Sequence, residues 1–195
     1  MLYTVRRVLP YEYPKYRTHL KALDPEAQLL RFGFQIKEES LDAFCMGIEA
    51  DPDNHVLFCV ENEDLEFVGI GHIAFGKDME LAFSVLKPYR GTGMGDALMA
   101  RCIQYCRTHN VLKGKMICLS HNTPIKKLCA KHGITMYSEH GETEGEITLP
   151  GPDLTAYINE QIAAQSAILD FVIKRNPITL TNKLLSSTIS YPRQL

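Results

Sequence analysis

Short apolar stretches recur along this chain, and most of them are bounded by turn-forming residues. Such stretches are typical of β-strands, half-buried where apolar and polar residues alternate and fully buried where the run is unbroken. The predicted strands are residues 3–9, 55–60, 66–75, 80–86, 115–120, 134–138 and 144–149. Short polar links join the second, third and fourth segments, so we expect an antiparallel meander there. The last two are predicted to form a hairpin across His140-Gly141.

Other stretches carry apolar residues at helical spacing, three and four positions apart. The predicted helices are residues 16–23, 26–31, 40–48, 96–109, 125–131 and 153–174. We expect Asp24 and Ser40 to cap the second and third helices, because short polar side chains satisfy the first free N–H groups. Gly133 and Pro177 are expected to end the last two helices.

The order of these elements predicts the fold class and the domain organisation. Segment 115–120 follows a strand–helix unit, so we expect it to run parallel to segment 80–86 in an otherwise antiparallel sheet. The fold class is therefore α/β of the α+β kind, a mixed, mostly antiparallel sheet flanked by helices. Pro150-Gly151-Pro152 predicts a boundary between a domain of residues 1–150 and a C-terminal helical extension and tail, residues 151–195.

The terminal helix has an apolar stripe that is long enough to pack on its own domain or on a second copy of the chain. A homodimer is therefore one expectation. The tail 178–195 is rich in Ser and Thr, and we expect it to be only partly ordered.

The composition excludes several classes of protein. The chain has 195 residues and a formal net charge of -2, which does not favour a nucleic-acid partner. No apolar run reaches the length of about 18 residues that a membrane span needs. Arg6 and Arg7 interrupt the segment where a signal peptide needs an apolar core, so we expect a cytoplasmic protein.

Six cysteines are scattered along the sequence with no CxxC pair. In a cytoplasmic protein this pattern favours reduced, buried thiols over disulfides. Cys102 and Cys106 share one face of a predicted helix, but no partner pair is evident, so we expect no metal site.

A glycine-rich turn joins strand 80–86 to helix 96–109. The N-terminus of a helix carries unpaired N–H groups and the positive end of the helix dipole, which together suit a phosphate. Gly93 and Gly95 lack a Cβ, so a ligand could approach the backbone closely. The turn therefore predicts a phosphate-binding site.

Two motifs carry a resemblance to a known family. The first is the RxxGxG pattern of residues 90–95, and the second is Asn122 followed eleven residues later by Gly133. In this context of strands and helices, from about residue 55 to 149, they resemble the acetyl-CoA signature of the GNAT superfamily of N-acetyltransferases.

A closer similarity is carried by segments 30–33 and 80–85 and by the terminal helix. These resemble a group of small bacterial stand-alone GNAT proteins. The strand that contains Glu80 is also similar to the acetyltransferase domains of protein-lysine acetylating enzymes.

The resemblance implies a seven-stranded sheet that splays between strands four and five, with acetyl-CoA entering the splay as co-substrate. The pyrophosphate would lie on N–H groups of residues 91–96, and the pantetheine arm would pair with the backbone around Val85 like an added strand. Family members often have a bulge here that aims one N–H at the thioester oxygen, with Phe83, Ser84 and Val85 as candidates. The expected cofactor-binding residues are Ser84, Val85, Arg90, Gly91, Thr92, Gly93, Met94, Gly95, Asp96 and Asn122.

Two of these residues have a second interpretation. Arg90 could contact phosphate or order its own loop, and it could also be an ordinary surface arginine. Asn122 could hydrogen-bond the pantetheine arm, cap the helix that follows it, or do both.

Glu80 is the candidate general base. Acetyl transfer needs a neutral amine, and the pKa of an alkylammonium is about 10, so a group near the strand end must accept its proton. The alternative is a solvated glutamate in a turn with Lys77 and Asp78.

The general acid is open. Many GNAT enzymes place a tyrosine where this chain has Cys129, and a thiol could protonate the leaving thiolate, although a small buried cysteine is the other interpretation. Tyr137 could replace it from the next strand. Because a thiolate is a good leaving group, an acid is also dispensable.

The acceptor side is predicted less sharply. Arg31, Phe32, Gly33 and Phe34 fall in the helical segment that covers the acceptor in this fold, although core packing is the alternative. An acidic cluster on the closing hairpin would attract a cationic amine if it bordered the cleft. Its members are Glu139, Glu142, Glu144 and Glu146.

These features together predict transfer of an acetyl group to a primary amine by direct attack on the thioester. The acceptor, a small-molecule amine or a protein lysine, stays open. The alternative is a non-catalytic acyl-CoA-binding sensor or interaction module on the same fold, which the missing tyrosine favours.

Overall fold

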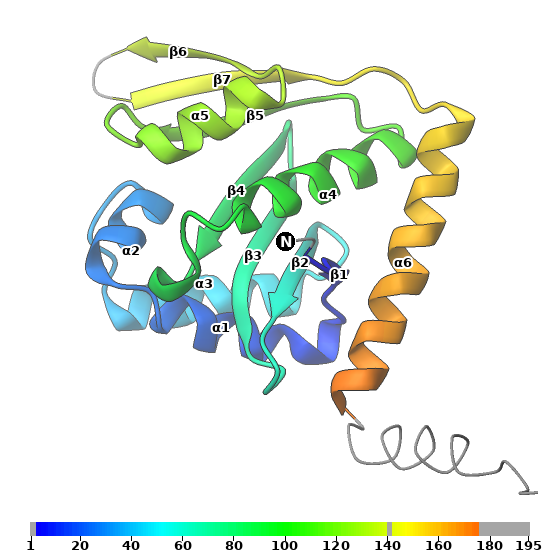
Figure 1. Ribbon diagram of the computed structural model, residues 1–195. Coiled ribbons are helices and arrows are strands. Elements are labelled where there is room, and N and C mark those ends of the chain that lie inside the picture. Colours follow the sequence, from blue (N-terminus) through cyan, green and yellow to red (C-terminus); the bar gives the residue numbers. More distant parts are fainter. Residues whose placement is uncertain (1–2, 140–141, 176–195) are drawn as a thin grey trace, which may run out of the picture.

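The computed structural model describes residues 3–139 and 142–175, and its centre is a seven-stranded sheet (Figure 1). The strand order is β1-β2-β3-β4-β5-β7-β6, and every neighbouring pair is antiparallel except β4 and β5. The strands are β1 (Arg6–Arg7), β2 (His55–Glu61), β3 (Phe67–Phe75), β4 (Met79–Val85), β5 (Lys113–Leu119), β6 (Thr135–Glu139) and β7 (Glu142–Thr148). The mixed sheet predicted from the sequence is therefore confirmed.

The parallel pair β4 and β5 is joined over only a short length. Met79 pairs with Gly114 and Glu80 with Lys115, and beyond these the two strands no longer pair. Figure 1 shows β5, β6 and β7 as a group set apart from β1–β4. One edge of β4 is consequently left open over its second half.

Helices cover both faces of the sheet. The helices are α1 (Tyr13–Lys21), α2 (Pro25–Phe32), α3 (Glu38–Ala50), α4 (Met94–Thr108), α5 (Thr123–Lys131) and α6 (Leu154–Arg175). α4 packs on β2, β3 and β4 on one face, and α1 and α3 form a second core with β2 and β3 on the other. Alternate residues of the strands feed these two cores, as the period of two requires.

Two helix starts differ from their predictions. α3 begins at Glu38 with Lys37 at the N-cap position and no side-chain cap, so the prediction that Ser40 caps this helix is wrong. Two glutamates in the first turn are stabilised by the positive end of the helix dipole, which allows the earlier start. α1 begins at Tyr13, three residues before the predicted start, with Pro14 in its first turn. By contrast, the carboxylate of Asp24 does cap α2, accepting from the N–H of Ala27 at 3.2 Å.

The first strand is much shorter than predicted, because only Arg6 and Arg7 pair with β2. The Arg6 guanidinium is buried and donates to Glu12 at 2.7 Å and to Glu61 at 2.5 Å. This buried network, followed by a 3-10 turn that starts at Pro10, ends the strand.

α6 packs on its own domain through one face. Arg101 on α4 donates to Glu160 at 2.8 Å, and Arg6 on β1 lies over the ring of Phe171 at 4.7 Å. The other face is apolar and exposed, with Leu154, Tyr157, Ile158, Ile162, Ile168, Leu169, Val172 and Ile173. The homodimer and the domain boundary at residue 150 stay predictions. Pro177, the tail and the turn at His140-Gly141 lie outside the described residues.

All six cysteines are free and buried. No helix in the ranges 3–139 and 142–175 is long and apolar enough to cross a membrane. The same residues contain no cluster of histidine, cysteine and carboxylate side chains that could hold a metal ion.

Candidate active site

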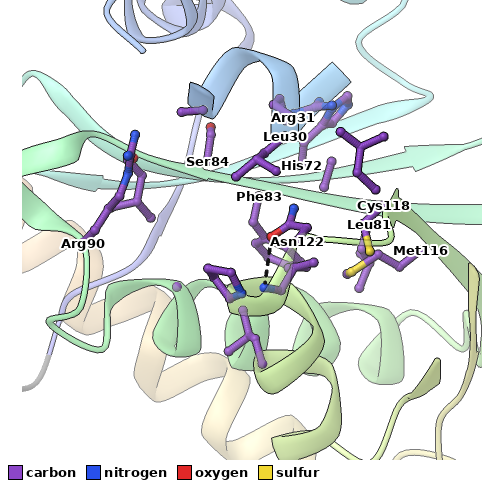
Figure 2. A pocket seen from close by; sticks show the side chains of 18 of the residues that line it. Leu30, Arg31, His72, Leu81, Phe83, Ser84, Arg90, Met116, Cys118 and Asn122 are labelled. Carbon is purple, nitrogen blue, oxygen red and sulfur yellow. Dashed lines mark hydrogen bonds between the residues drawn. The ribbon is translucent and has the colours of Figure 1, made fainter. Parts of the chain in front are cut away.

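A cavity of about 1050 Å³ opens where β4 and β5 diverge. Its walls come from α2, β4, the loop 89–96, β5 and the first turns of α5, with contributions from β2 and β3. Figure 2 shows Arg31 and His72 on one side of β4 and Asn122 on the other. The volume exceeds what one drug-sized ligand needs, so a cofactor and an acceptor could both enter.

The loop before α4 forms one end of this cavity. Gly91 and Gly93 have φ values of +74° and +89°, a region that L-residues with a Cβ rarely adopt, and Gly93 is the N-cap of α4. The N–H groups of residues 91–96 make no hydrogen bond to any described part of the chain. The glycine turn therefore presents a row of free donors at the positive end of a helix, as the sequence predicts.

The side chains of this loop have other partners. Met94 is buried in the core, and the Thr92 hydroxyl donates to the carbonyl of Tyr89 at 2.6 Å. Thr92 is the one predicted loop residue that does not line the cavity. Only the backbone of these two residues could therefore serve a phosphate.

Asp96 is held by α5. Its carboxylate accepts from Lys131 at 2.6 Å and meets His132 Nε2 at 2.8 Å. The hydrogen bond from Lys131 lowers the pKa of Asp96, burial opposes it, and the hydrogen bond with His132 adds to the lowering. The loop end of the cavity thus carries a carboxylate whose charge is already balanced.

Arg90 orders the loop. Its Nε donates to the carbonyl of Val85 at 3.0 Å, and its Nη2 is ion-paired with Asp24. Of the three interpretations of Arg90, the geometry therefore favours a role in ordering the loop, because the guanidinium holds the loop against β4 and α2.

The open edge of β4 presents backbone groups to the cavity. The N–H of Leu86 donates to Val68 on the β3 side, and in an antiparallel strand the direction of these groups alternates. The backbone groups of Phe83 and Val85 therefore point away from β3, toward the gap. The carbonyl of Val85 already accepts from Arg90, but an extended chain could pair with the N–H of Val85 and with the backbone groups of Phe83.

The bulge that the resemblance implies is not found between β3 and β4. The two strands keep one register from the pair Gly69–Val85 to the pair Phe75–Met79. Ser84 accordingly directs its backbone toward β3, and its hydroxyl lies 2.8 Å from Nε2 of His19. Ser84 lines the cavity, but its polar groups are occupied elsewhere.

Asn122 both caps α5 and faces the cavity. Its Oδ1 accepts from the N–H of Ile125 at 3.3 Å, and the residue is buried. The Nδ2 group makes no hydrogen bond among the described residues. It is therefore a donor that remains available to a ligand.

Glu80 lies at the point where β4 and β5 separate. Its side chain is 54% exposed, lines the cavity, and has its Oε1 3.8 Å from Nζ of Lys115. In the sheet it is opposite Ala74 of β3. A carboxylate at this position can accept a proton from a ligand that enters over Ala74.

The two candidate general acids are not in the cavity. Cys129 is fully buried with its Sγ 3.3 Å from Sδ of Met116, and burial raises the pKa of its thiol to about 11. Tyr137 is 65% exposed on β6, which β7 separates from β5. Neither lines the cavity, because the first side chain points into the core and the second is on the outermost strand.

The acceptor side is partly as predicted. Arg31, Phe32 and Gly33 line the cavity, whereas Phe34 is exposed outside it. Glu144 and Glu146 are exposed on β7 and do not line it. The other two members of the acidic cluster are Glu139 and Glu142, whose side chains are not among those that the structure describes.

A chain of polar side chains on this side was not predicted. Nη2 of Arg31 lies 3.3 Å from Nδ1 of His72, and Nε2 of His72 lies 3.0 Å from Nδ1 of His55. All three residues line the cavity. The signal in the sequence was the histidine in each of two predicted neighbouring strands, which only the strand register brings together.

The family model described as Acetyltransferase (GNAT) family matches residues 20–134. The chain belongs to this family. It is therefore an acyltransferase of the kind that uses acyl-CoA in N-acetyl transfer.

Solved structures of this family share the fold. The GNAT domain of PAT from S. lividans is 18% identical, with a TM-score of 0.62 over 74% of this chain and 89% of that one. Ribosomal-protein-alanine N-acetyltransferase from Brucella melitensis is 16% identical, with a TM-score of 0.57 over 76% and 100%. The PaiA N-acetyltransferase from Thermoplasma acidophilum, in complex with coenzyme A, is 10% identical, with a TM-score of 0.56 over 76% and 99%.

The residues of the cavity fit an acyl-CoA. The free N–H row of residues 91–96 suits a pyrophosphate, and the open edge of β4 suits the amides of a pantetheine arm. The Nδ2 group of Asn122 adds one donor across the gap. These groups would hold the cofactor, which supplies an acyl group activated as a thioester.

Proposed function

We propose that this protein transfers an acetyl group from acetyl-CoA to a primary amine by direct attack of the amine on the thioester. The observation that carries this proposal is the juxtaposition of the N–H row at residues 91–96, the open edge of β4, and Glu80 in one cavity. In this proposal the cofactor-binding groups are the backbone of residues 91–96, Phe83 and Val85, and the side chain of Asn122.

Glu80 is the group that we assign to the proton. The amine nitrogen forms a bond to the carbonyl carbon, the C–S bond breaks, and the proton of the amine passes to Glu80, directly or through water. Its Oε1 lies 3.8 Å from Nζ of Lys115, and a carboxylate that lines the cavity can act as a general base.

No side chain is assigned as general acid. Cys129 and Tyr137 lie outside the cavity. A thiolate leaves without protonation more readily than an alkoxide or an amide ion, so the transfer does not need the missing group. The same absence is the one observation that favours the second candidate, an acyl-CoA-binding protein without turnover.

A panel of amines separates the two candidates. The protein is mixed with acetyl-CoA and each amine in turn, and released CoA is measured with a thiol reagent. Release that rises with one class of amine, with the acetylated amine found by mass spectrometry, is the expected result. Binding of acetyl-CoA without release for any amine would overturn the proposed enzyme and favour the sensor.

A further inference from the structure

Arg31, near the end of α2, is a cation that faces the cavity and has no carboxylate partner among the residues that the structure describes. Its Nη2 group lies 3.1 Å from the hydroxyl of Tyr16 and 3.3 Å from Nδ1 of His72. These two contacts use both hydrogens of Nη2. Within residues 3–139 and 142–175 the Nε and Nη1 groups make no hydrogen bond, and the guanidinium makes no ion pair. Because a guanidinium has five N–H donors, three are available to a ligand.

The guanidinium is held in one orientation. It lies over the ring of Phe32 at 5.0 Å and near that of Phe44 at 5.7 Å, and these two rings pack edge to face with their centroids 5.4 Å apart. Both rings line the cavity. Because the cation is already ordered, a ligand that binds it does not bear the entropy of fixing a long side chain.

The two histidines beside Arg31 have defined proton positions. A guanidinium only donates, so Nδ1 of His72 accepts and its Nε2 carries the hydrogen. That hydrogen is donated to Nδ1 of His55, which leaves the Nε2 of His55 protonated as well. Burial, and then the charge of Arg31, keep the pKa of His72 well below its usual value, so its ring is neutral. His55 is half-buried at the cavity wall, and its Nε2–H group is a donor that the hydrogen bonds among Arg31, His72 and His55 do not use.

The sheet places this donor group and Glu80 on the same face. His55 is opposite Ala74, and Ala74 is opposite Glu80, so the three residues form a row across β2, β3 and β4. Two strand spacings of about 4.8 Å separate the ends of the row by roughly 10 Å at the backbone. The small side chain of Ala74 leaves space between them, in the cavity that Arg31 also lines.

We propose that the acetyl acceptor is a small amine that carries a carboxylate, of the amino-acid class. The carboxylate binds Arg31, with the N–H of His55 beside it, and the amine lies at Glu80. This inference rests on the proposed function and names its substrate class.

The charges along the cavity favour this class over a cationic acceptor. Arg31 would repel a polyamine, and Glu144 and Glu146 do not border the cavity. The remaining carboxylates of the lining, Glu26 and Asp96, do not compete for Arg31. Glu26 is in the first turn of α2, more than one helical turn from Arg31, and Asp96 is bound to Lys131. Lys127 also lines the cavity without a carboxylate partner among the described residues, but it is on α5. On α2, Arg31 is the one cation, and it matches one negative charge.

Matched ligands test this assignment. Each common amino acid is compared with its C-terminal amide and with its decarboxylated amine at saturating acetyl-CoA, and CoA release gives kcat/KM. We expect the free carboxylate to raise kcat/KM at least tenfold over both partners. An aminoalkyl phosphate is included, and a rate above that of the carboxylates would overturn the assignment to carboxylate.

Three variants show whether Arg31 carries the preference. Arg31→Gln should raise KM for the amino acid tenfold or more while leaving the kinetics of the amide unchanged, and Arg31→Lys should restore part of the preference. Arg7→Gln removes an exposed arginine outside the cavity and should behave as wild type. Equal losses on acid and amide in Arg31→Gln would contradict the proposal.

The two proposals fail in different ways. If no amine is acetylated, the proposed function is wrong. The carboxylate site at Arg31 is then tested separately, by calorimetric titration of the same ligands into the CoA-bound protein. Binding of amino acids that is weakened by Arg31→Gln supports the carboxylate site, and no binding, or equal binding of acid and amide, overturns it. If amides and simple amines are acetylated as fast as amino acids, the enzyme stands and the substrate class is wrong.

Discussion

Arg90, on the loop before α4, is ion-paired with Asp24, the residue that caps α2. One carboxylate therefore ties the loop with the free N–H row to the helix that carries Arg31. The cap uses Oδ1 of Asp24 and the ion pair uses Oδ2, so both contacts exist at once. The cofactor end of the cavity and its acceptor wall are thus joined by a single residue pair.

This pair predicts a shared effect on cofactor affinity. Arg90→Gln and Asp24→Asn should each raise the dissociation constant of acetyl-CoA about fivefold, because a loosened loop must be ordered on binding, at a cost of about 1 kcal/mol. Both variants remove the same ion pair, and Arg90→Gln also removes the hydrogen bond to Val85, so the double variant should lose no more than Arg90→Gln alone. Calorimetric titration measures all three. Losses that simply add would show that Arg90 acts on the cofactor independently of Asp24.

Two glycines of the loop should respond to alanine in opposite ways. Gly93 has a φ of +89°, so Gly93→Ala should lower the free energy of unfolding by about 1 to 2 kcal/mol through backbone strain alone. Gly95 is in the first turn of α4, and a Cβ there would meet only Leu128 at an ordinary 3.7 Å. Gly95→Ala should therefore leave the fold as stable or stabilise it by up to about 1 kcal/mol.

The same two variants should nevertheless share a loss of acetyl-CoA affinity. Gly95 lines the cavity, and a methyl group there would obstruct a phosphate that approaches the N–H row. Urea unfolding gives the stability, and titration of acetyl-CoA gives the affinity. A Gly95→Ala variant that binds acetyl-CoA as tightly as wild type would place the pyrophosphate elsewhere.

His19 predicts how stability depends on pH. Burial lowers the pKa of His19 to about 4, against the opposing effect of its hydrogen bond to the carbonyl of Phe67, whereas an unfolded histidine titrates near 6.5. Between these values the unfolded chain binds a proton that the folded chain does not. The neutral form of His19 therefore contributes fully to the free energy of unfolding above pH 6.5. About 3 kcal/mol of this free energy is lost as the pH falls toward 4.

Urea unfolding at several values between pH 7 and pH 4 checks this. His19→Gln should be less stable than wild type at pH 7 but should lose less stability on acidification. His121→Gln, which changes an exposed histidine, is the matched control for the substitution itself. A variant at position 19 that declines as steeply as wild type would assign the effect to other groups.

The sequence predicted the features that depend on long apolar runs or on short motifs. β2, β3 and β4 lie within about a residue of their predicted limits, because each is a continuous apolar segment bounded by polar residues. The cap at Asp24 and the N–H row at residues 91–96 each depend only on the helix that follows directly in the sequence. Local rules are sufficient for such features.

Features that depend on contacts between residues far apart in the sequence could not be predicted. His55 and His72 meet only because β2 and β3 pair in one register, and the partner of Arg90 is a carboxylate 66 positions away. Ser40 has the right chemistry for an N-cap, but the chain enters the helix two residues earlier. Cys129 was expected as a candidate acid from the resemblance, yet the packing of α5 turns its side chain into the core.

The most direct test of this account concerns Glu80. Glu80→Gln keeps the shape of the side chain and removes its basicity, so acetyl-CoA should bind with unchanged affinity while kcat falls about a hundredfold, in the range that a general base supplies. Binding and turnover are measured on the same preparation, with the best amine from the panel and from pH 6 to 9. A variant that binds acetyl-CoA normally and keeps the wild-type kcat across this pH range would contradict the assignment of Glu80 as the base.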